Sequence, residues 1–395
     1  MVKEKKEEIL ENKIEKSVDM SLYNEESTKM KSNPHEYIMD WMEANLIHVG
    51  RRVFSLLALV PGSIILPNIP FGTSGIRSTI NVFYISPPAS GKSTTSKKFA
   101  KICYFPLQRR TISPADLRSR AISMRFLNLI IEDFSENVEE HGYDFIKALE
   151  GILGEEQNVS KSNMRTELMG DVKATGLLCG TPIDVEKYSK LIESGLLSRC
   201  CLLYITLTSE QHSQIGDYIN SRIGNTEYSE KLGLQELVVE DYYKSLKEIQ
   251  EGKNKDVHPV TGYSIPTDFK TKAGEVWKRI SEELMVEFPQ VHWTRDLQEF
   301  YRFLLSSAFL NIHHRKNDNG ILVPNEEDFK LALRLMKQNM RYKWAIFKST
   351  GLNKRIKSAE ILNQVLNSNI PDSVKNILMN ISPYSSLINK KNIFK

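Results

Sequence analysis

Residues 81–95 read NVFYISPPASGKSTT and join an apolar run to a short loop and the start of a helix. The run NVFYIS, residues 81–86, is β-branched and aromatic, which is typical of a buried strand. After the loop, residues 94–103 read TTSKKFAKIC and have a helical pattern. A strand, a tight loop and a helix in this order predict one unit of an α/β fold.

The loop resembles the phosphate-binding pattern G-x-x-x-x-G-K-[ST] over Ser86 to Ser93. Gly91 would let the backbone approach phosphates, Lys92 would contact the β- and γ-phosphates of ATP, and Ser93 would bind Mg²⁺. Serine can replace the first glycine where φ is not positive. The alternative, a chance Gly-Lys-Ser, is disfavoured by the flanking strand and helix. We expect nucleotide contacts from Ser86, Pro88, Ala89, Ser90, Gly91, Lys92, Ser93 and Thr94.

Three further apolar runs have the character of parallel strands. They cover Phe126 to Ile131, Thr175 to Cys179 and residues 201–206, and helical segments separate them. Continuously apolar strands indicate a parallel sheet that is covered on both faces. From Asp268 onward the pattern is helical. The fold class is therefore predicted as a P-loop α/β sheet flanked by helices, followed by an α-helical lid.

An acidic pair follows the second apolar run. Glu132 would hold Mg²⁺ through water, and Asp133 would orient or deprotonate the attacking water. The alternative is a pair of surface acids after a core strand.

Three more polar residues stand where strands or helices begin or end. Thr181 follows an apolar run and would help to place the lytic water, or it merely begins a loop. Arg199 precedes another run and is either a structural surface residue or a finger that reaches the ATP of the next subunit. Arg295 begins a long amphipathic helix and would reach the γ-phosphate from the lid, or it is an ordinary exposed residue.

These features in this order resemble an AAA+ ATPase, and more narrowly the minichromosome maintenance (MCM) branch of hexameric replicative helicases. The resemblance covers residues 40–340. Its parts are the loop Ser86–Ser93, the acidic segment Ile131–Phe134, the finger Leu196–Arg199 and the helix that begins Thr294-Arg295-Asp296-Leu297. The resemblance implies a homo-oligomer, a hexameric ring that acts on single- or double-stranded DNA with ATP and Mg²⁺ as cofactors.

The same resemblance implies a hairpin in the channel of the ring. The segment ALEGILGEEQNVSKSNM is similar to the family's helix and hairpin, and Lys161 stands at the position of the lysine that contacts DNA phosphates, with Arg165 nearby. Such contacts add affinity without reading base sequence. The alternative is that Lys161 lies on an ordinary solvated loop.

The chain also departs from the family. The acids are in the order Glu-Asp where the family has Asp-Glu, so we expect slow hydrolysis or a different placement of water. Thr181 replaces an asparagine. The residues before Asn81 are too few for the family's N-terminal DNA-binding and zinc region, and those between Thr111 and Phe126 are too few for its second hairpin.

Five segments are expected along the chain. They are a polar and partly disordered tail (1–33), an N-terminal helical segment (34–75), the α/β ATPase core (76–215), a linker with the helical lid (216–345) and a small helical C-terminal segment (346–395). The last is predicted to be either a small winged-helix remnant or a partner-binding tail.

Composition restricts the setting of the protein. Hydrophobic residues make up 41% and charged residues 26%, and the formal net charge of +4 permits a nucleic-acid partner without requiring one. The four cysteines form no C-x-x-C pair, so we expect reduced thiols rather than a zinc site. We expect no membrane partner, and a cytoplasmic (nucleoid) location or the host cytoplasm if the chain is viral.

Two functions remain open from the sequence. The first is an ATP-hydrolysing ring motor on DNA, an MCM-like helicase or translocase of plasmid or viral replication. The second is a non-motor AAA+ switch or scaffold that assembles on DNA and recruits a replication, recombination or transposition protein. A DNA-packaging ATPase is a further possibility.

Overall fold

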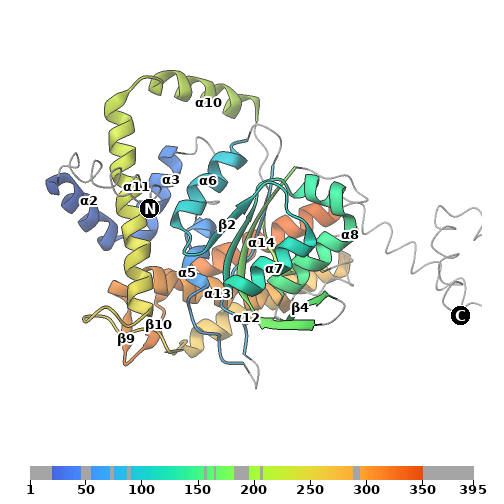
Figure 1. The fold of residues 1–395 in the computed structure, drawn as a ribbon. Helices are drawn as coiled ribbons and strands as arrows, with labels where there is room; N and C mark the ends of the chain where they lie inside the picture. The colour runs from blue at the N-terminus through green and yellow to red at the C-terminus, as the bar shows by residue number, and fades with distance from the viewer. Residues whose placement is uncertain are drawn as a thin grey trace, which may run out of the picture.

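The structure is a computed structural model of the chain. It describes residues 20–45, 55–71, 75–86, 90–154, 158–163, 166–181, 195–204, 208–287 and 294–349. Figure 1 shows a central sheet with helices around it, and a long helical part that wraps beside it.

The central sheet has five strands, and all of its pairings are parallel. Their order is β2 (Pro106–Arg109), β3 (Phe126–Ile131), β6 (Lys173–Gly180), β1 (Val82–Ile85) and β7 (Cys201–Tyr204). The predicted parallel α/β sheet is thus confirmed. Strand β2 escaped prediction because its sequence, Pro-Leu-Gln-Arg, is short and has only one buried apolar side chain, as an edge strand allows.

Helices cover both faces of this sheet. The crossover helix α6 (Lys92–Ile102) lies on one side, and α7 (Pro114–Met124) with α8 (Phe134–Leu153) lies on the other (Figure 1). Every residue of β1 is buried, and β6 is buried from Ala174 to Gly180. This two-sided cover explains why the strands are continuously apolar rather than alternating.

Two buried asparagines join neighbouring strands. Asn128 in β3 donates its amide to Thr175 Oγ1 at 2.7 Å. Asn81, next to β1, donates to the carbonyl of Leu153 at 3.2 Å and accepts from the amide of Gly176 at 3.1 Å. Buried amides of this kind need such partners, because each unmet hydrogen bond would cost about 1–3 kcal/mol.

The second half of the chain is mostly helical. It contains α10 (Ser209–Arg222), α11 (Thr226–Gln250), α12 (Thr267–Glu287), α13 (Thr294–Leu310) and α14 (Glu326–Ser349). Helix α13 packs on α14, and α14 packs on the edge strand β7. One continuous cluster of buried hydrophobic residues runs from Met30 to Phe347 and includes residues of α11, α12, α13 and α14, so these four helices share a core with the sheet.

A small sheet interrupts the region expected to be helical after Asp268. It contains β8 (Gly262–Tyr263), β10 (Ile321–Val323) and β9 (Lys316–Asp318). Asn319 and Gly320 turn between β9 and β10 with φ of 52° and 83°. Asparagine followed by glycine favours this hairpin turn, so the pattern was present in the sequence and was overlooked.

Three N-terminal helices complete the described chain. They are α2 (Met20–Ser32), α3 (Pro34–Asn45) and α5 (Val60–Ser63). Helix α2 falls within the segment expected to be a polar tail, yet it packs on α11 and buries Met30. Its Tyr23 hydroxyl donates to Asp241 of α11 at 2.8 Å. The rest of that tail, residues 1–19, lies outside the described residues, as does nearly all of the expected C-terminal segment (350–395).

All four cysteines are buried free thiols. Within the described ranges, no helix combines the length and apolar character that crossing a bilayer requires.

A buried ion pair joins α13 to α14. Lys343 donates to Asp296 Oδ1 at 2.8 Å, and both side chains are 2% exposed. Asn339 also donates to Asp296 at 2.9 Å and accepts from the backbone amide of Leu202 in β7 at 2.8 Å. This network therefore links the helical part to the edge of the sheet.

We expect Lys343→Met to lower the free energy of unfolding by about 3–5 kcal/mol, because Asp296 would remain buried without its cation. Adding Asp296→Asn should recover more than about half of that loss, since the amide still accepts from Asn339 without carrying a charge. Urea unfolding of the three proteins measures both values. Additive losses in the double variant would contradict this account of the pair.

Candidate functional site

The carboxyl ends of the parallel strands meet at one edge of the central sheet. In the sheet register, Ile85 pairs with Gly180, and Ile131 pairs with Leu178. Ser86 extends this pattern, because its amide donates to the carbonyl of Gly180 at 3.1 Å. Open α/β sheets bind ligands outside this edge. The polar residues that follow β1, β3 and β6 therefore share one edge.

Helix α6 begins at this edge without a side-chain cap. Its N-cap residue is Gly91, which has φ 81° and ψ 12° and caps no amide with a side chain. By contrast, Ser113 caps α7 and Asp133 caps α8. A Cβ on residue 91 would meet no atom within 4 Å, so the backbone angle, rather than space, requires glycine there. The first amides of α6 thus have no such side chain competing for an anion.

Lys92 is half-buried at the first position of α6. Its ammonium donates to the carbonyl of Ser86 at 2.6 Å, which folds the side chain back over the loop. Burial lowers the pKa of Lys92, and the nearby carboxylate of Asp133 acts in the opposite direction. Ser86 and Ser90 are both buried, and their hydroxyl oxygens lie 2.5 Å apart. Ser86, at the start of the loop, is therefore in contact with Ser90 and Lys92 at its end.

Other expected nucleotide contacts are described less fully. Ser93 and Thr94 are exposed on the first turn of α6. Pro88 and Ala89 lie outside the described residues.

Glu132 lies between β3 and α6. Its Oε1 atom accepts from Ser96 at 3.4 Å, and Gln108 of β2 also donates to it. Ser96 in turn donates to the carbonyl of Ser93 at 3.0 Å. The carboxylate of Glu132 is thus held beside the first turn of α6. Ser93, which is expected to bind Mg²⁺, is linked to this carboxylate through Ser96.

Asp133 has a structural role in this conformation. It is the N-cap of α8, and its Oδ1 atom accepts from the amide of Glu136 at 3.0 Å. An aspartate cap typically stabilises a helix by about 1 kcal/mol. Its negative charge also acts to raise the pKa of Lys92, against the larger effect of burial.

Thr181 follows β6, the strand that separates β1 from β3. Its hydroxyl lies 3.2 Å from the hydroxyl of Ser135 in α8. The sheet order thus places Thr181 between the loop after β1 and the acids after β3.

Arg199 lies at the opposite edge of the sheet. It ends a short 3₁₀ helix (Leu197–Arg199) that leads into β7, and its carbonyl accepts from Asn81 at 3.3 Å. Its guanidinium is 3.5 Å from the buried carboxylate of Glu150 in α8, and its side chain remains 27% exposed.

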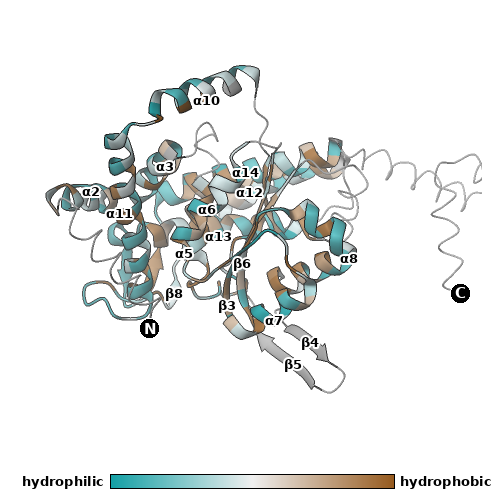
Figure 2. Cartoon of the chain, turned by 45° about the horizontal axis from the view of Figure 1, so that its top comes forward, coloured by the Kyte–Doolittle hydropathy of each residue, from teal (hydrophilic) through white to brown (hydrophobic). Residues whose placement is uncertain are grey.

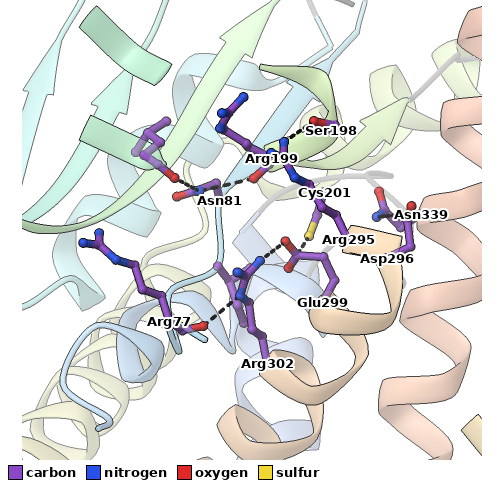
Figure 3. Close-up of polar contacts among 12 residues, drawn as sticks. Arg77, Asn81, Ser198, Arg199, Cys201, Arg295, Asp296, Glu299, Arg302 and Asn339 are labelled. Atoms are coloured by element: carbon purple, nitrogen blue, oxygen red, sulfur yellow. Dashed lines mark hydrogen bonds and ion pairs between the residues drawn. The ribbon is translucent and has the colours of Figure 1, made fainter. Parts of the chain in front are cut away.

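Arg295 is beside Arg199 rather than beside the loop after β1. Its guanidinium donates to the hydroxyl of Ser198 (Figure 3). Arg77 and Arg302 line the same small hollow, where Arg302 donates to the carbonyl of Arg77 at 2.8 Å and pairs with Glu299. Four arginines and the acids Glu150 and Glu299 therefore gather at this edge.

The amino and carboxyl ends of the strands are too far apart for one arginine side chain to span the distance. Each strand residue advances roughly 3.3 Å, so the five steps from Asn81 to Ser86 span about 17 Å. An arginine side chain is shorter than this distance. In this structure, therefore, neither Arg199 nor Arg295 reaches the loop after β1.

An antiparallel hairpin follows α8. It pairs β4 (Asn158–Asn163) with β5 (Thr166–Asp171) and packs beside α7 and α8. Lys161 is on β4 opposite Leu168. Arg165 lies outside the described residues. A hairpin was expected here from the family resemblance, and one is present.

Several contributing residues were missed in the sequence. Gln108 and Ser96 hold Glu132, and Glu150 holds Arg199. Gln108 belongs to the strand that escaped prediction. Ser96 follows Ser93 by one helical turn, so helical spacing alone would have placed them on one face.

The residues present fit a magnesium nucleotide. A helix start without a side-chain cap, an adjacent ammonium and a carboxylate held beside the same turn match the three needs of such a ligand. These needs are amide donors, charge neutralisation and a hard oxygen ligand.

No known protein-family model matches this sequence, and a search of curated proteins found no significant relative.

Proposed function

We propose that this chain is a P-loop ATPase of the AAA+ type that works as a ring motor on DNA, similar to an MCM helicase or translocase. The observation that carries the proposal is the start of α6. There an uncapped helix follows a buried strand, with Lys92 folded over the loop and Glu132 held beside the first turn.

In this proposal the chain's own residues bind and orient the reactants. The amides of α6 and the ammonium of Lys92 hold the phosphates, and Ser93 with Glu132 holds Mg²⁺. When bound, MgATP supplies the phosphoanhydride bond and the metal's charge neutralisation. Asp133 and Thr181 orient the attacking water, and Asp133 accepts its proton.

A neighbouring subunit completes the proposed site. The span of about 17 Å between the two edges supports a shared arrangement, because Arg199 and Arg295 face away from their own loop. Repeating this head-to-tail contact closes a ring. The hairpin β4–β5 would then project Lys161 toward DNA in the channel.

A second candidate is a non-motor ATP switch that recruits a partner. It is favoured by the acids, because Asp133 caps α8 and Glu132 accepts from Gln108 and Ser96. These internal bonds compete with their proposed catalytic roles. DNA-stimulated ATP turnover with strand displacement would support the motor, and ATP-dependent assembly without either would support the switch.

We expect Lys92→Ala to raise the Kd for ATP roughly 100-fold or more, because it removes the charged group that meets the phosphates. Lys97→Ala, an exposed change one turn further along α6, is the matched control and should leave binding unchanged. Titration of a fluorescent ATP analogue measures both. Tight binding by the Lys92 variant would refute the phosphate-loop assignment.

Arg199→Ala should bind ATP normally but lower turnover by roughly 10³- to 10⁵-fold. Arg120→Ala on α7, an exposed ion-paired arginine, is the control and should keep turnover. Mixing the Arg199 and Lys92 variants should restore part of the activity, because some interfaces then join an intact Lys92 to an intact Arg199. Absence of restoration would contradict a shared site.

Lys161→Ala should weaken DNA binding and reduce the slope of log K against log salt by roughly one. The measurement is fluorescence anisotropy across a salt series. Unchanged affinity and slope would remove the DNA-contact role from the hairpin.

A further inference from the structure

Helix α14 carries a row of cations on its outward face. Lys330, Arg334, Lys337 and Arg341 follow one another at steps of four, three and four residues, so they lie along one side of the helix. Lys337 is partly buried, and the other three are exposed. The opposite side of α14 is buried, including Ala332, Met336, Asn339 and Lys343. We call these four cations the α14 row.

The α14 row has no ion-pair partner among the residues that the structure describes. Among the described residues, no carboxylate lies within 4.0 Å of any of these four cations. Two other cations, on α14 and just before β9, are paired: Lys343 with Asp296 at 2.8 Å and Arg315 with Asp328 at 2.7 Å. Within the described ranges, the positive charge of the row therefore has no carboxylate to neutralise it.

Two hollows flank the row. Helices α12 and α14 pack on each other, and Figure 2 shows both behind the central sheet. One hollow, of about 620 Å³, has a lining from both helices that includes Ile280, Leu284 and Trp344. The other, of about 550 Å³, is lined partly by Leu333 and Tyr342. Lys337 and Arg341 border both hollows.

The charge around the hollows is also mainly positive. Arg279 on α12 faces the first hollow together with one acid, Glu283. Lys348 extends the basic side of α14, with its ammonium 4.5 Å from the ring centroid of Trp344. Cations thus alternate with apolar and aromatic surface along this side of the molecule.

We propose that the α14 row binds single-stranded nucleic acid. Sites for single strands combine a positive track for the phosphates with aromatic side chains on which bases stack. The row supplies the track, and the hollows beside Trp344 and Tyr342 supply the apolar surface for the bases. A duplex keeps its bases stacked inside and offers nothing to those hollows, which favours the single strand.

This inference goes beyond the proposed ATPase function and does not depend on it. The row belongs to α14, whereas the candidate nucleotide site follows β1 and the proposed channel contact is Lys161 on β4. Binding by the row should therefore persist in Lys92→Ala and Lys161→Ala.

The test is fluorescence anisotropy with a labelled oligo-dT of 20 nucleotides, without ATP, between 50 and 200 mM salt. The test variant combines Lys330→Gln, Arg334→Gln, Lys337→Gln and Arg341→Gln, because glutamine favours helix. We expect a loss of affinity of at least 100-fold at 50 mM salt. The slope of log K against log salt should become shallower by about 3, because each of the four lost phosphate contacts contributes roughly 0.7 to the slope for a single strand.

A matched control removes four exposed lysines that lie outside α14, each paired with an acid within four residues of it. It combines Lys244→Gln, Lys253→Gln, Lys272→Gln and Lys316→Gln, so the change in net charge is the same. This control should stay within about twofold of the parent. Trp344→Leu should lower affinity roughly fivefold or more with an unchanged salt slope, because it removes stacking and no charge.

Two smaller variants keep the test decisive if the fourfold variant does not fold. The pair Lys330→Gln with Arg334→Gln, and the pair Lys337→Gln with Arg341→Gln, should each reduce the slope by about 1.4. Unchanged affinity and slope in both pairs would overturn the proposal. An equal loss of affinity in the matched control would also overturn it. So would a change in the particle mass of the row variants, measured by light scattering, with their oligonucleotide binding intact, because that result would identify the row as an interface between chains.

Discussion

The parallel pairing of β1 with β6 is the constraint on which the candidate site depends. Val82 pairs with Leu177 and Ile85 with Gly180, and all four residues are buried. A slip of one residue would turn every side chain to the other face of the sheet. The hydrogen bond from Ser86 to Gly180 would be lost as well, and with it the alignment of the loop with the acids after β3.

The parallel direction of the strands places two different sets of polar groups at opposite ends of the sheet. Its carboxyl edge collects helix amides, Lys92 and two acids, whereas its amino edge collects four arginines. Asn81 holds the amino edge together, since its side chain contacts the carbonyls of Leu153 and Arg199 and the amide of Gly176. Arg199 is thereby fixed to the same rigid sheet that carries the loop, as a shared site between subunits would require.

The helical part completes this arrangement instead of forming a separate body. The buried pair Asp296–Lys343 and the contact of Asn339 with β7 attach α13 and α14 to the sheet edge. Arg295 is held near Ser198 by that attachment. The same packing turns the opposite side of α14 outward, so one helix contributes both to the core and to the basic surface that we propose for nucleic acid.

The sequence by itself determined the sheet class, because mainly apolar runs such as 126–131 and 175–179, separated by helical segments, are typical of parallel strands covered on both faces. It also placed Lys92 in a loop just before a helix expected from Thr94, since Gly91 and the preceding strand are local signals, and the structure begins that helix at Lys92. It missed β2, which has a single buried apolar side chain, and the β9–β10 hairpin, although Asn319-Gly320 is a local turn signal. Only the tertiary structure decided that Asp133 caps α8, that Glu150 holds Arg199 and that Arg295 lies at the far edge. Those relations join residues distant along the chain, and the strand order that creates them is not written in any local pattern.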